Sequence, residues 1–81
     1  MYVNDQLKKY AVEYIRGERT LSECSIPGVK WSPYRKALLA SHKYYNSSQK
    51  TPSLLLEKKR AESRFWLETG IPWPDLSREL S

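Results

Sequence analysis

Helix-breaking residues divide this chain of 81 residues into short segments, and this division constrains its fold more than any other feature. The three glycines and five prolines lie at the boundaries of apolar-periodic segments or in the C-terminal tail. Glycine ends a helix because it adopts the left-handed cap conformation without a steric clash, whereas proline fits a helix only in its first turn. Between the breaks, apolar residues such as Leu7, Ala11 and Ile15 recur at helical spacing. The pattern predicts an all-α fold, a compact bundle of four helices.

The cap and stop residues predict helices near residues 5–16, 20–26, 33–45 and 53–69. We expect Asn4 and Asp5 to cap the first helix and Gly17 to end it. Thr20 and Glu23 have the spacing of a capping box, in which each side chain satisfies a backbone N–H of the other residue. This predicts a short second helix before Pro27 and Gly28.

The third and fourth predicted helices begin with a favoured cap residue followed by proline. Ser32 precedes Pro33, and Thr51 precedes Pro52. The residues expected to face the core of the third helix are Tyr34, Ala37, Leu38, Ser41 and Tyr45. Those expected to face it in the fourth helix, which Gly70 ends, are Leu54, Leu55, Ala61 and Phe65. The segment after Pro74 leaves room for one more helical turn or two.

The chain is short enough that we expect a single helical domain over residues 1–81, with residues 71–81 packed on it as a tail. Within this tail, Trp73 lies between Pro72 and Pro74, which restrict its backbone. One interpretation is that Trp73 and Leu76 form a stiff anchor for a protein partner. We favour the other interpretation, in which Trp73 covers the domain's own core with Leu76 beside it.

The net charge of +5 is concentrated in the middle of the chain. Residues 24–56 contain no Asp or Glu, yet they carry five cations and His42; the cations are Lys30, Arg35, Lys36, Lys43 and Lys50. A helix that begins with cations and has no acid nearby favours binding of a polyanion such as nucleic acid. The alternative is an ordinary solvated face without a ligand.

The segment from Thr20 to about Leu39 resembles the helix-turn-helix of small bacterial and phage DNA-binding proteins. In that alignment Cys24 takes the position of a small residue between the helices, and Gly28 lies at the turn. Val29, Tyr34 and Leu38 fall at or near apolar positions of the motif. Pro27 and the bulky Tyr34 and Trp31 depart from the usual pattern. The resemblance implies that the helix beginning near Ser32 reads the major groove of DNA.

The resemblance also implies roles for individual side chains. Arg35 is the candidate for bidentate contact with a guanine edge, and the lysines are candidates for phosphate contacts. Trp31 either stacks on the sugar–phosphate edge or packs as a structural residue. The candidate nucleic-acid-binding residues are Lys30, Trp31, Ser32, Arg35, Lys36, Lys43 and Lys50.

A second basic cluster lies in the fourth predicted helix, at Lys58, Lys59, Arg60 and Arg64. The acids Glu57, Glu62 and Glu68 stand at spacings that favour ion pairs with these cations. We therefore expect an exposed, ion-paired helix face, with a second set of phosphate contacts as the alternative.

The sequence offers little for catalysis. One His and one Cys cannot supply a zinc site with ordinary ligand spacing, and no glycine-rich phosphate loop is present. We expect no enzymatic activity, no metal and no cofactor. The single Cys24 fits a reducing compartment, where it is expected to be a small core residue. No apolar run is long enough for a membrane span, and the first residues lack a secretion-signal pattern. These features predict a cytoplasmic protein, nucleoid-associated if it binds DNA.

Two functional hypotheses follow from these residues. The first is a small basic protein that binds double-stranded DNA, as a transcriptional regulator or as an architectural or recombination accessory factor. Such proteins often form homodimers, which doubles their contact area. The second is a protein-interaction module, an inhibitor or adaptor of a larger enzyme or complex, that uses Trp73 and Leu76 in its tail.

Overall fold

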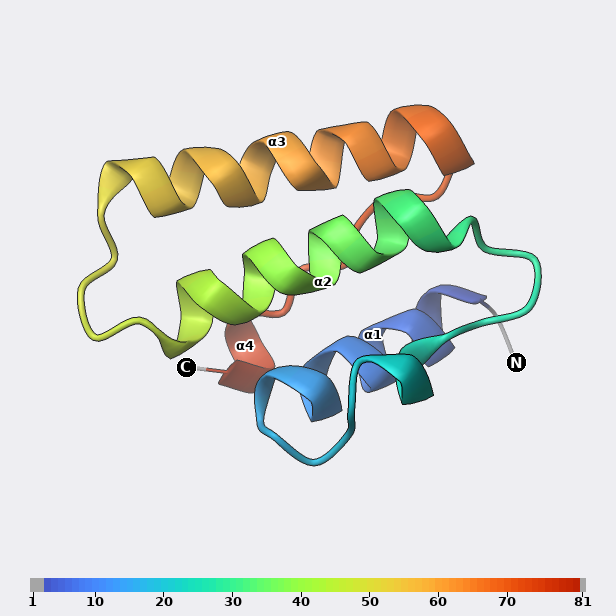
Figure 1. Cartoon of the computed structure of the whole chain (residues 1–81), viewed down its shortest axis with the longest axis horizontal. Helices are drawn as coiled ribbons and strands as arrows, with labels where there is room; N and C mark the ends of the chain where they lie inside the picture. Colours follow the sequence, from blue (N-terminus) through green and yellow to red (C-terminus); the bar gives the residue numbers. More distant parts are fainter. Residues whose placement is uncertain (1–2, 81) are drawn as a thin grey trace.

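Three long helices and a C-terminal segment make up the molecule. The computed structural model of the chain describes residues 3–80, and its elements are α1 (Val3–Ile15), a 3-10 turn (Ser22–Cys24), α2 (Trp31–Asn46), α3 (Pro52–Thr69) and α4 (Ser77–Leu80). In Figure 1 the central helix α2 lies between α1 and α3, and α2 and α3 run antiparallel. The described residues contain no strand, so the predicted all-α fold is confirmed.

The boundaries of α3 follow the local signals in the sequence. The Thr51 hydroxyl accepts a hydrogen bond from the Leu54 N–H at 3.3 Å, and Pro52 occupies the first turn. Gly70 ends the helix at φ +75°, and its N–H donates to the Trp66 carbonyl at 2.8 Å. Gly17 has a φ of +82° just after α1. These caps and stops form as predicted because each depends only on residues within one turn.

Two predicted N-caps were wrong. Helix α1 already includes Val3, so Asn4 and Asp5 lie inside its first turn. Helix α2 begins at Trp31, and its N-cap is Lys30, whose side chain makes no capping hydrogen bond. Ser32 therefore lies within the first turn and is not the cap. Pro33 permits this earlier start, because the first four N–H groups of any helix have no partner inside the helix.

The predicted helix over residues 20–26 was also wrong: this segment forms only the 3-10 turn. The Glu23 carboxylate accepts from the Thr20 N–H at 2.9 Å, which is one half of the expected capping box. However, the Thr20 hydroxyl donates to the same carboxylate at 2.8 Å, and the Glu23 N–H bonds to the Thr20 carbonyl at 3.1 Å. The hydroxyl therefore closes a tight local turn, and Pro27 prevents this turn from continuing as a helix. These bonds hold the pKa of Glu23 below its ordinary value.

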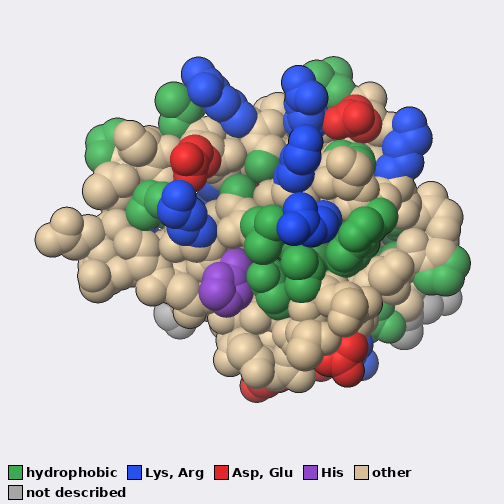
Figure 2. Space-filling view, in the orientation of Figure 1, with side chains coloured by type: hydrophobic (Ala, Val, Ile, Leu, Met, Phe, Trp, Pro, Cys, Tyr) green, Lys and Arg blue, Asp and Glu red, His purple; other side chains and the backbone are tan. Residues whose placement is uncertain are grey.

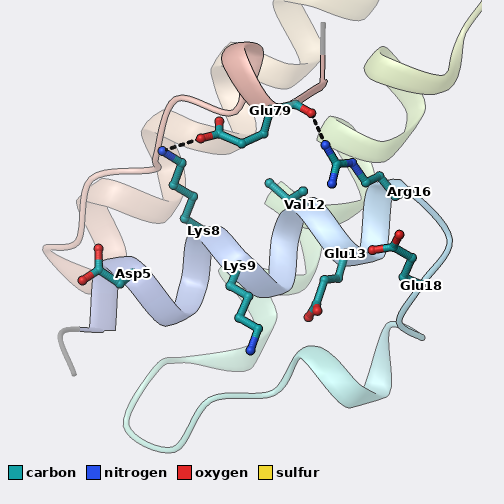
Figure 3. A pocket seen from close by; sticks show the side chains of 8 residues that line it. All are labelled: Asp5, Lys8, Lys9, Val12, Glu13, Arg16, Glu18 and Glu79. Carbon is teal, nitrogen blue, oxygen red and sulfur yellow. Dashed lines mark hydrogen bonds and ion pairs between the residues drawn. The ribbon is translucent and has the colours of Figure 1, made fainter.

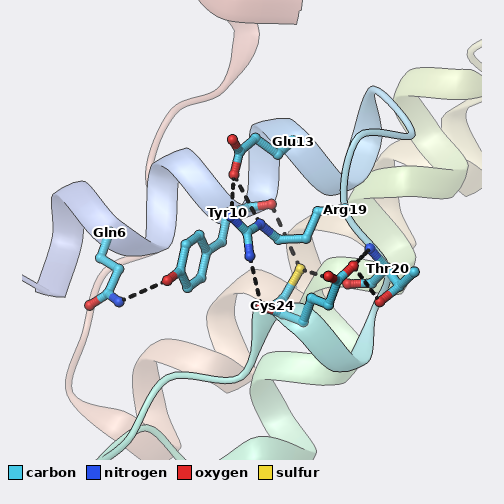
Figure 4. Close-up of polar contacts among 7 residues, drawn as sticks. Gln6, Tyr10, Glu13, Arg19, Thr20 and Cys24 are labelled. Carbon is cyan, nitrogen blue, oxygen red and sulfur yellow. Dashed lines mark hydrogen bonds and ion pairs between the residues drawn. The ribbon is translucent and has the colours of Figure 1, made fainter.

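Polar contacts fasten this turn to α1 (Figure 4). The Arg19 guanidinium bonds to Glu13 at 2.9 Å and lies over the Tyr10 ring, 4.0 Å from its centroid. The Cys24 thiol is fully buried and donates to the Thr20 carbonyl at 3.4 Å. Cys24 is thus a packing residue, as predicted.

The core lies on both sides of α2. From α2, the residues Tyr34, Ala37, Leu38 and Ser41 are fully buried, and Tyr45 is half-buried. Helix α3 packs chiefly on α2, and of its residues only Phe65 is fully buried, with Ala61 packed against the core. Leu54 and Leu55 were predicted to be core residues, but they are only half-buried and do not belong to the residues that pack against the core. Helix α1 lies on the opposite side of α2, so α3 packs chiefly on α2 alone. It therefore buries only one narrow stripe of its side chains.

The C-terminal segment passes from the end of α3 back to α1. The Trp73 ring packs edge-on against Phe65, with ring centroids 5.2 Å apart, and Leu76 is 1% exposed. Asp75 Oδ1 accepts from the Ser77 N–H at 3.0 Å and begins α4, the single turn expected after Pro74. An ion pair between Lys8 and Glu79 at 2.9 Å then ties α4 to α1. Trp73 therefore faces its own domain.

Replacing Trp73 by Ala should lower the free energy of unfolding by roughly 3 kcal/mol, because a packed aromatic ring is lost from a core of modest size. Chemical denaturation followed by far-UV circular dichroism measures this change. The matched control is Trp66→Ala, which removes a ring that is 55% exposed and should alter stability far less. A Trp73→Ala variant as stable as the parent, but of smaller apparent size on gel filtration, would contradict the inward packing.

The Cys24 thiol should be unreactive in the folded protein. Burial raises its pKa from an ordinary value of 9.0 to about 11, so the thiolate is scarce at neutral pH. Iodoacetamide at pH 8 should modify Cys24 slowly in buffer and rapidly in denaturant. Rapid native alkylation would show that the thiol is accessible.

The raised pKa of Cys24 also affects stability at high pH. Because the pKa of this thiol is higher in the folded protein than in the unfolded chain, the unfolded chain releases the proton first as pH rises. Stability from this group should be intact below about pH 9 and decline between about pH 9 and 11.

Candidate nucleic-acid interface

The first turns of α2 present cations and hydrogen-bond donors to solvent. Lys30, Ser32 and Arg35 are exposed, and the first turn contains no acid. The aligned peptide dipoles of a helix give its N-terminus a partial positive charge, which adds to that of the side chains. Trp31 is 37% exposed, and its ring meets Tyr34 edge-on at 5.8 Å. It therefore has a packing role and a partly free surface.

A groove between α2 and α3 brings further cations to this end of the molecule. The antiparallel arrangement places the first turns of α2 beside the last turns of α3 (Figure 1). The groove has a volume of about 250 Å³ and is lined by Pro33, Lys36, Arg60, Ala61 and Arg64. Three positive side chains from two helices thus line one depression, together with two small apolar residues.

The cations of this groove have no ion-pair partner among residues 3–80. Two of the three acids that were expected to neutralise them are engaged elsewhere, and the third, Glu68, is exposed and forms no ion pair among residues 3–80. Glu57 pairs across the helices with Lys43 at 3.4 Å, and Glu62 pairs with Lys58 at 2.7 Å. The ion pairing predicted for this helix is confirmed for Lys58 with Glu62 and is wrong for Arg60 and Arg64. Because no carboxylate lies within ion-pair distance of them, Lys36, Arg60 and Arg64 create a positive potential at the groove.

The ion pair between Lys58 and Glu62 lies where α3 packs on α2. Burial of Lys58 disfavours its ammonium form and is the largest single effect on its pKa. The hydrogen bond to Glu62, the charge of that carboxylate and the neighbouring Tyr45 and Tyr44 together outweigh it, so the pKa of Lys58 is raised. The ammonium also lies about 5.5 Å from the ring centroids of Tyr44 and Tyr45. Lys58 thus belongs to the packing between α2 and α3, unlike Arg60 and Arg64.

Lys43 and Lys50, two of the predicted site residues, lie away from this groove. Lys43 is about 20 Å from Lys30 along the axis of α2, given the rise of ~1.5 Å per residue. The Lys50 ammonium lies over the C-terminal end of α2, 3.2 Å from the Ser47 carbonyl. The structure therefore brings together Lys30, Ser32, Arg35 and Lys36, and separates the other two lysines from them.

Arg60 and Arg64 were not chosen as site residues from the sequence, and phosphate contacts there were only the alternative. A signal was present, because like charges four residues apart share one face of a helix. Only the packing of α3 on α2 shows that this face borders Lys36. Figure 2 shows the result: Lys and Arg side chains gather over α3 and the adjoining part of α2, with fewer acidic side chains among them.

A surface pocket of about 460 Å³ beside α1 has a different character (Figure 3). Its lining includes Lys8, Lys9 and Arg16, but also four acids: Asp5, Glu13, Glu18 and Glu79. Lys8 pairs with Glu79, and the Arg16 guanidinium donates to the Glu79 carbonyl. With both signs present, this pocket does not favour an anion.

The helix-turn-helix resemblance is not confirmed by the fold. The segment that should supply the first helix of the pair is the 3-10 turn Ser22–Cys24. Helix α2, the expected reading helix, does not protrude over its whole length, since α1 and α3 flank it (Figure 1). Its first turns lie beside the last turns of α3, and the side chains of Lys30, Ser32 and Arg35 are exposed there.

The basic face, which we define as Lys30, Arg35, Lys36, Lys59, Arg60 and Arg64, is the strongest candidate site among residues 3–80. These residues contain no cluster of His, Cys, Asp or Glu that could hold a metal ion. No helix among them is long and apolar enough to cross a membrane. Comparison with protein-family models, curated proteins and solved structures finds no match for this chain.

Proposed function

We propose that this chain is a small DNA-binding protein that contacts double-stranded DNA with its basic face. One observation carries the proposal: Lys36, Arg60 and Arg64 converge on one groove and lack a carboxylate partner among residues 3–80. Unpaired cations on adjacent helices suit the phosphate backbone, which supplies much of the affinity in protein–DNA complexes.

The side chains divide into two roles in this proposal. Arg60 and Arg64 contact phosphates along one strand, and Lys36 contacts the same backbone from α2. Arg35 and Ser32 project from the first turns of α2, where they reach base edges in the major groove. A planar guanidinium matches the paired acceptors of guanine, so Arg35 is the residue that contributes sequence preference.

This activity suits a transcriptional regulator or an architectural or recombination accessory factor acting on the nucleoid, as a monomer or as a homodimer. The alternative, a protein-interaction module that uses the tail, has lost its main support. Trp73 and Leu76 pack into the core and are not available as an exposed anchor.

Binding to a short random-sequence duplex should weaken steeply with salt. About five phosphate contacts predict a slope of about −4 to −5 in a plot of log affinity against log salt concentration. Arg64→Gln should reduce the size of this slope by about 1 without altering the thermal midpoint, because Arg64 has no ion pair to lose. Fluorescence anisotropy measures the slope.

The matched control is Lys9→Gln, which removes one exposed charge from α1, beside Glu13 and Glu18. It should leave the slope unchanged. If the affinity for DNA does not depend on salt, or if Arg64→Gln and Lys9→Gln change the salt slope equally, the basic face is not the binding surface.

Arg35 should determine sequence preference, whereas Lys36 should not. In a pool of duplexes enriched by the parent protein, Arg35→Ala should reduce discrimination between sites by about 1–3 kcal/mol. Lys36→Ala should weaken all sites alike, because a phosphate contact carries no sequence information. Lys43→Ala should have a smaller uniform effect, since Lys43 is paired with Glu57. If the Arg35→Ala/Lys36→Ala double variant binds as well as the parent, α2 is not a DNA-contacting element.

A further inference from the structure

Three depressions on α3 join into one continuous path. The groove beside α2 shares Arg60 and Arg64 with a second depression of about 420 Å³. This second depression shares Lys59 and Ser63 with a third, of about 300 Å³, on the other side of α3. We call this path the α3 track. It leads from the α2–α3 groove, over the outer face of α3, to a pocket lined by Lys59, Glu62, Ser63, Trp66, Pro72 and Trp73.

The far end of the α3 track is aromatic. Trp66 is 55% exposed, although Trp side chains are highly buried on average. Beside it, Trp73 is held by its edge-on contact with Phe65 and by the prolines on either side. The pocket therefore combines one free indole face with a rigid wall.

The rest of the α3 track is positively charged. Lys59, Arg60 and Arg64 are exposed and form no ion pair among residues 3–80. Glu62 is the acid in the lining of the aromatic pocket, and its carboxylate is engaged by Lys58 at 2.7 Å. The track thus offers cations along its length and an exposed aromatic ring at its end.

We propose that the α3 track binds a single DNA strand, with phosphates on Lys59, Arg60 and Arg64 and an unpaired base stacked on the Trp66 indole. Cations that follow the backbone, combined with an aromatic stacking surface, are the two elements of single-strand binding sites. The inference rests on the proposed function, because it adds to the duplex contacts of the basic face a contact with a DNA strand that carries unpaired nucleotides.

A second copy of this chain fits the α3 track less well. Two such faces would bring Lys59, Arg60 and Arg64 of each copy together, with Glu68 as the one acid of α3 that is not already in an ion pair among residues 3–80. The bases of a blunt duplex, in turn, are already stacked on one another and cannot use Trp66. An unpaired base is free to stack, and its phosphates match the charge.

Trp66→Ala should lower affinity for an oligothymidine strand by about tenfold, the size expected when one base–aromatic contact is lost. Affinity for a blunt duplex should stay within about twofold of the parent, because stacking on Trp66 is not available to paired bases. The salt slope for the single strand should not change, since no charge is removed. Fluorescence anisotropy with labelled oligothymidine and labelled duplex measures all three quantities.

Two further variants separate stacking from general apolar contact. Trp66→Phe keeps a flat ring and should retain affinity for oligothymidine within about threefold. Leu67→Ala removes a neighbouring apolar side chain that is 79% exposed but has no aromatic face, and it should bind oligothymidine as the parent does. Because Trp66 and Leu67 are both exposed, circular dichroism should show that all three variants fold.

The possible outcomes decide between the inference and the proposed function. A Trp66→Ala variant that binds oligothymidine as tightly as the parent overturns the α3 track, and if it still binds duplex the proposed function stands. If the parent protein binds neither oligothymidine nor the blunt duplex, the α3 track and the proposed function are both overturned. If Trp66→Ala and Leu67→Ala both convert a dimeric parent to a monomer, the face is an interface between copies and the track is overturned.

Discussion

Burial of the Tyr34 ring joins α2 to α3 and to the C-terminal tail. The ring is fully buried near the start of α2, with its centroid 6.0 Å from that of Phe65 in α3 and 6.1 Å from that of Trp73 in the tail. Burial also raises its pKa, so the phenol stays neutral. Because aromatic contacts hold the first turns of α2 against α3 and the tail, the position of Lys36 relative to Arg60 and Arg64 depends on this cluster.

The charges of the molecule are divided between structural and free sets. Lys8, Arg19, Lys43 and Lys58 pair with carboxylates, and the pairs of Lys43 and Lys58 use two of the acids of α3. Exposed ion pairs contribute little to stability, yet each one removes an acid that could have neutralised the basic face. The proposed binding surface therefore follows from where the acids are engaged as much as from where the cations lie.

The aromatic residues show a similar division. Trp73 packs inward and closes the core of a short chain, whereas Trp66, seven residues earlier, lies on the outer face of α3 with its ring exposed. The fold has one layer of helices on each side of α2, so α3 has a free outer face. In the α3 track this free face carries both the unpaired cations and the exposed ring.

The sequence by itself determined the helical segments and the inward face of α2. Gly17, Thr51 and Gly70 act on their own turn, and the spacing of Ala37, Leu38 and Ser41 marks one stripe, so these features needed no tertiary information. The short turn at Ser22–Cys24 was missed because local hydrogen bonds between Thr20 and Glu23 close it, and the start of α2 was missed because Lys30 begins the helix without a side-chain cap. Only the tertiary structure decided that Arg60 and Arg64 border Lys36, and it confirmed the inward packing of Trp73, which was the favoured one of two interpretations of the sequence. These contacts depend on the packing of α3 and the tail against α2, and residues so far apart in the chain leave no periodic signal of their meeting.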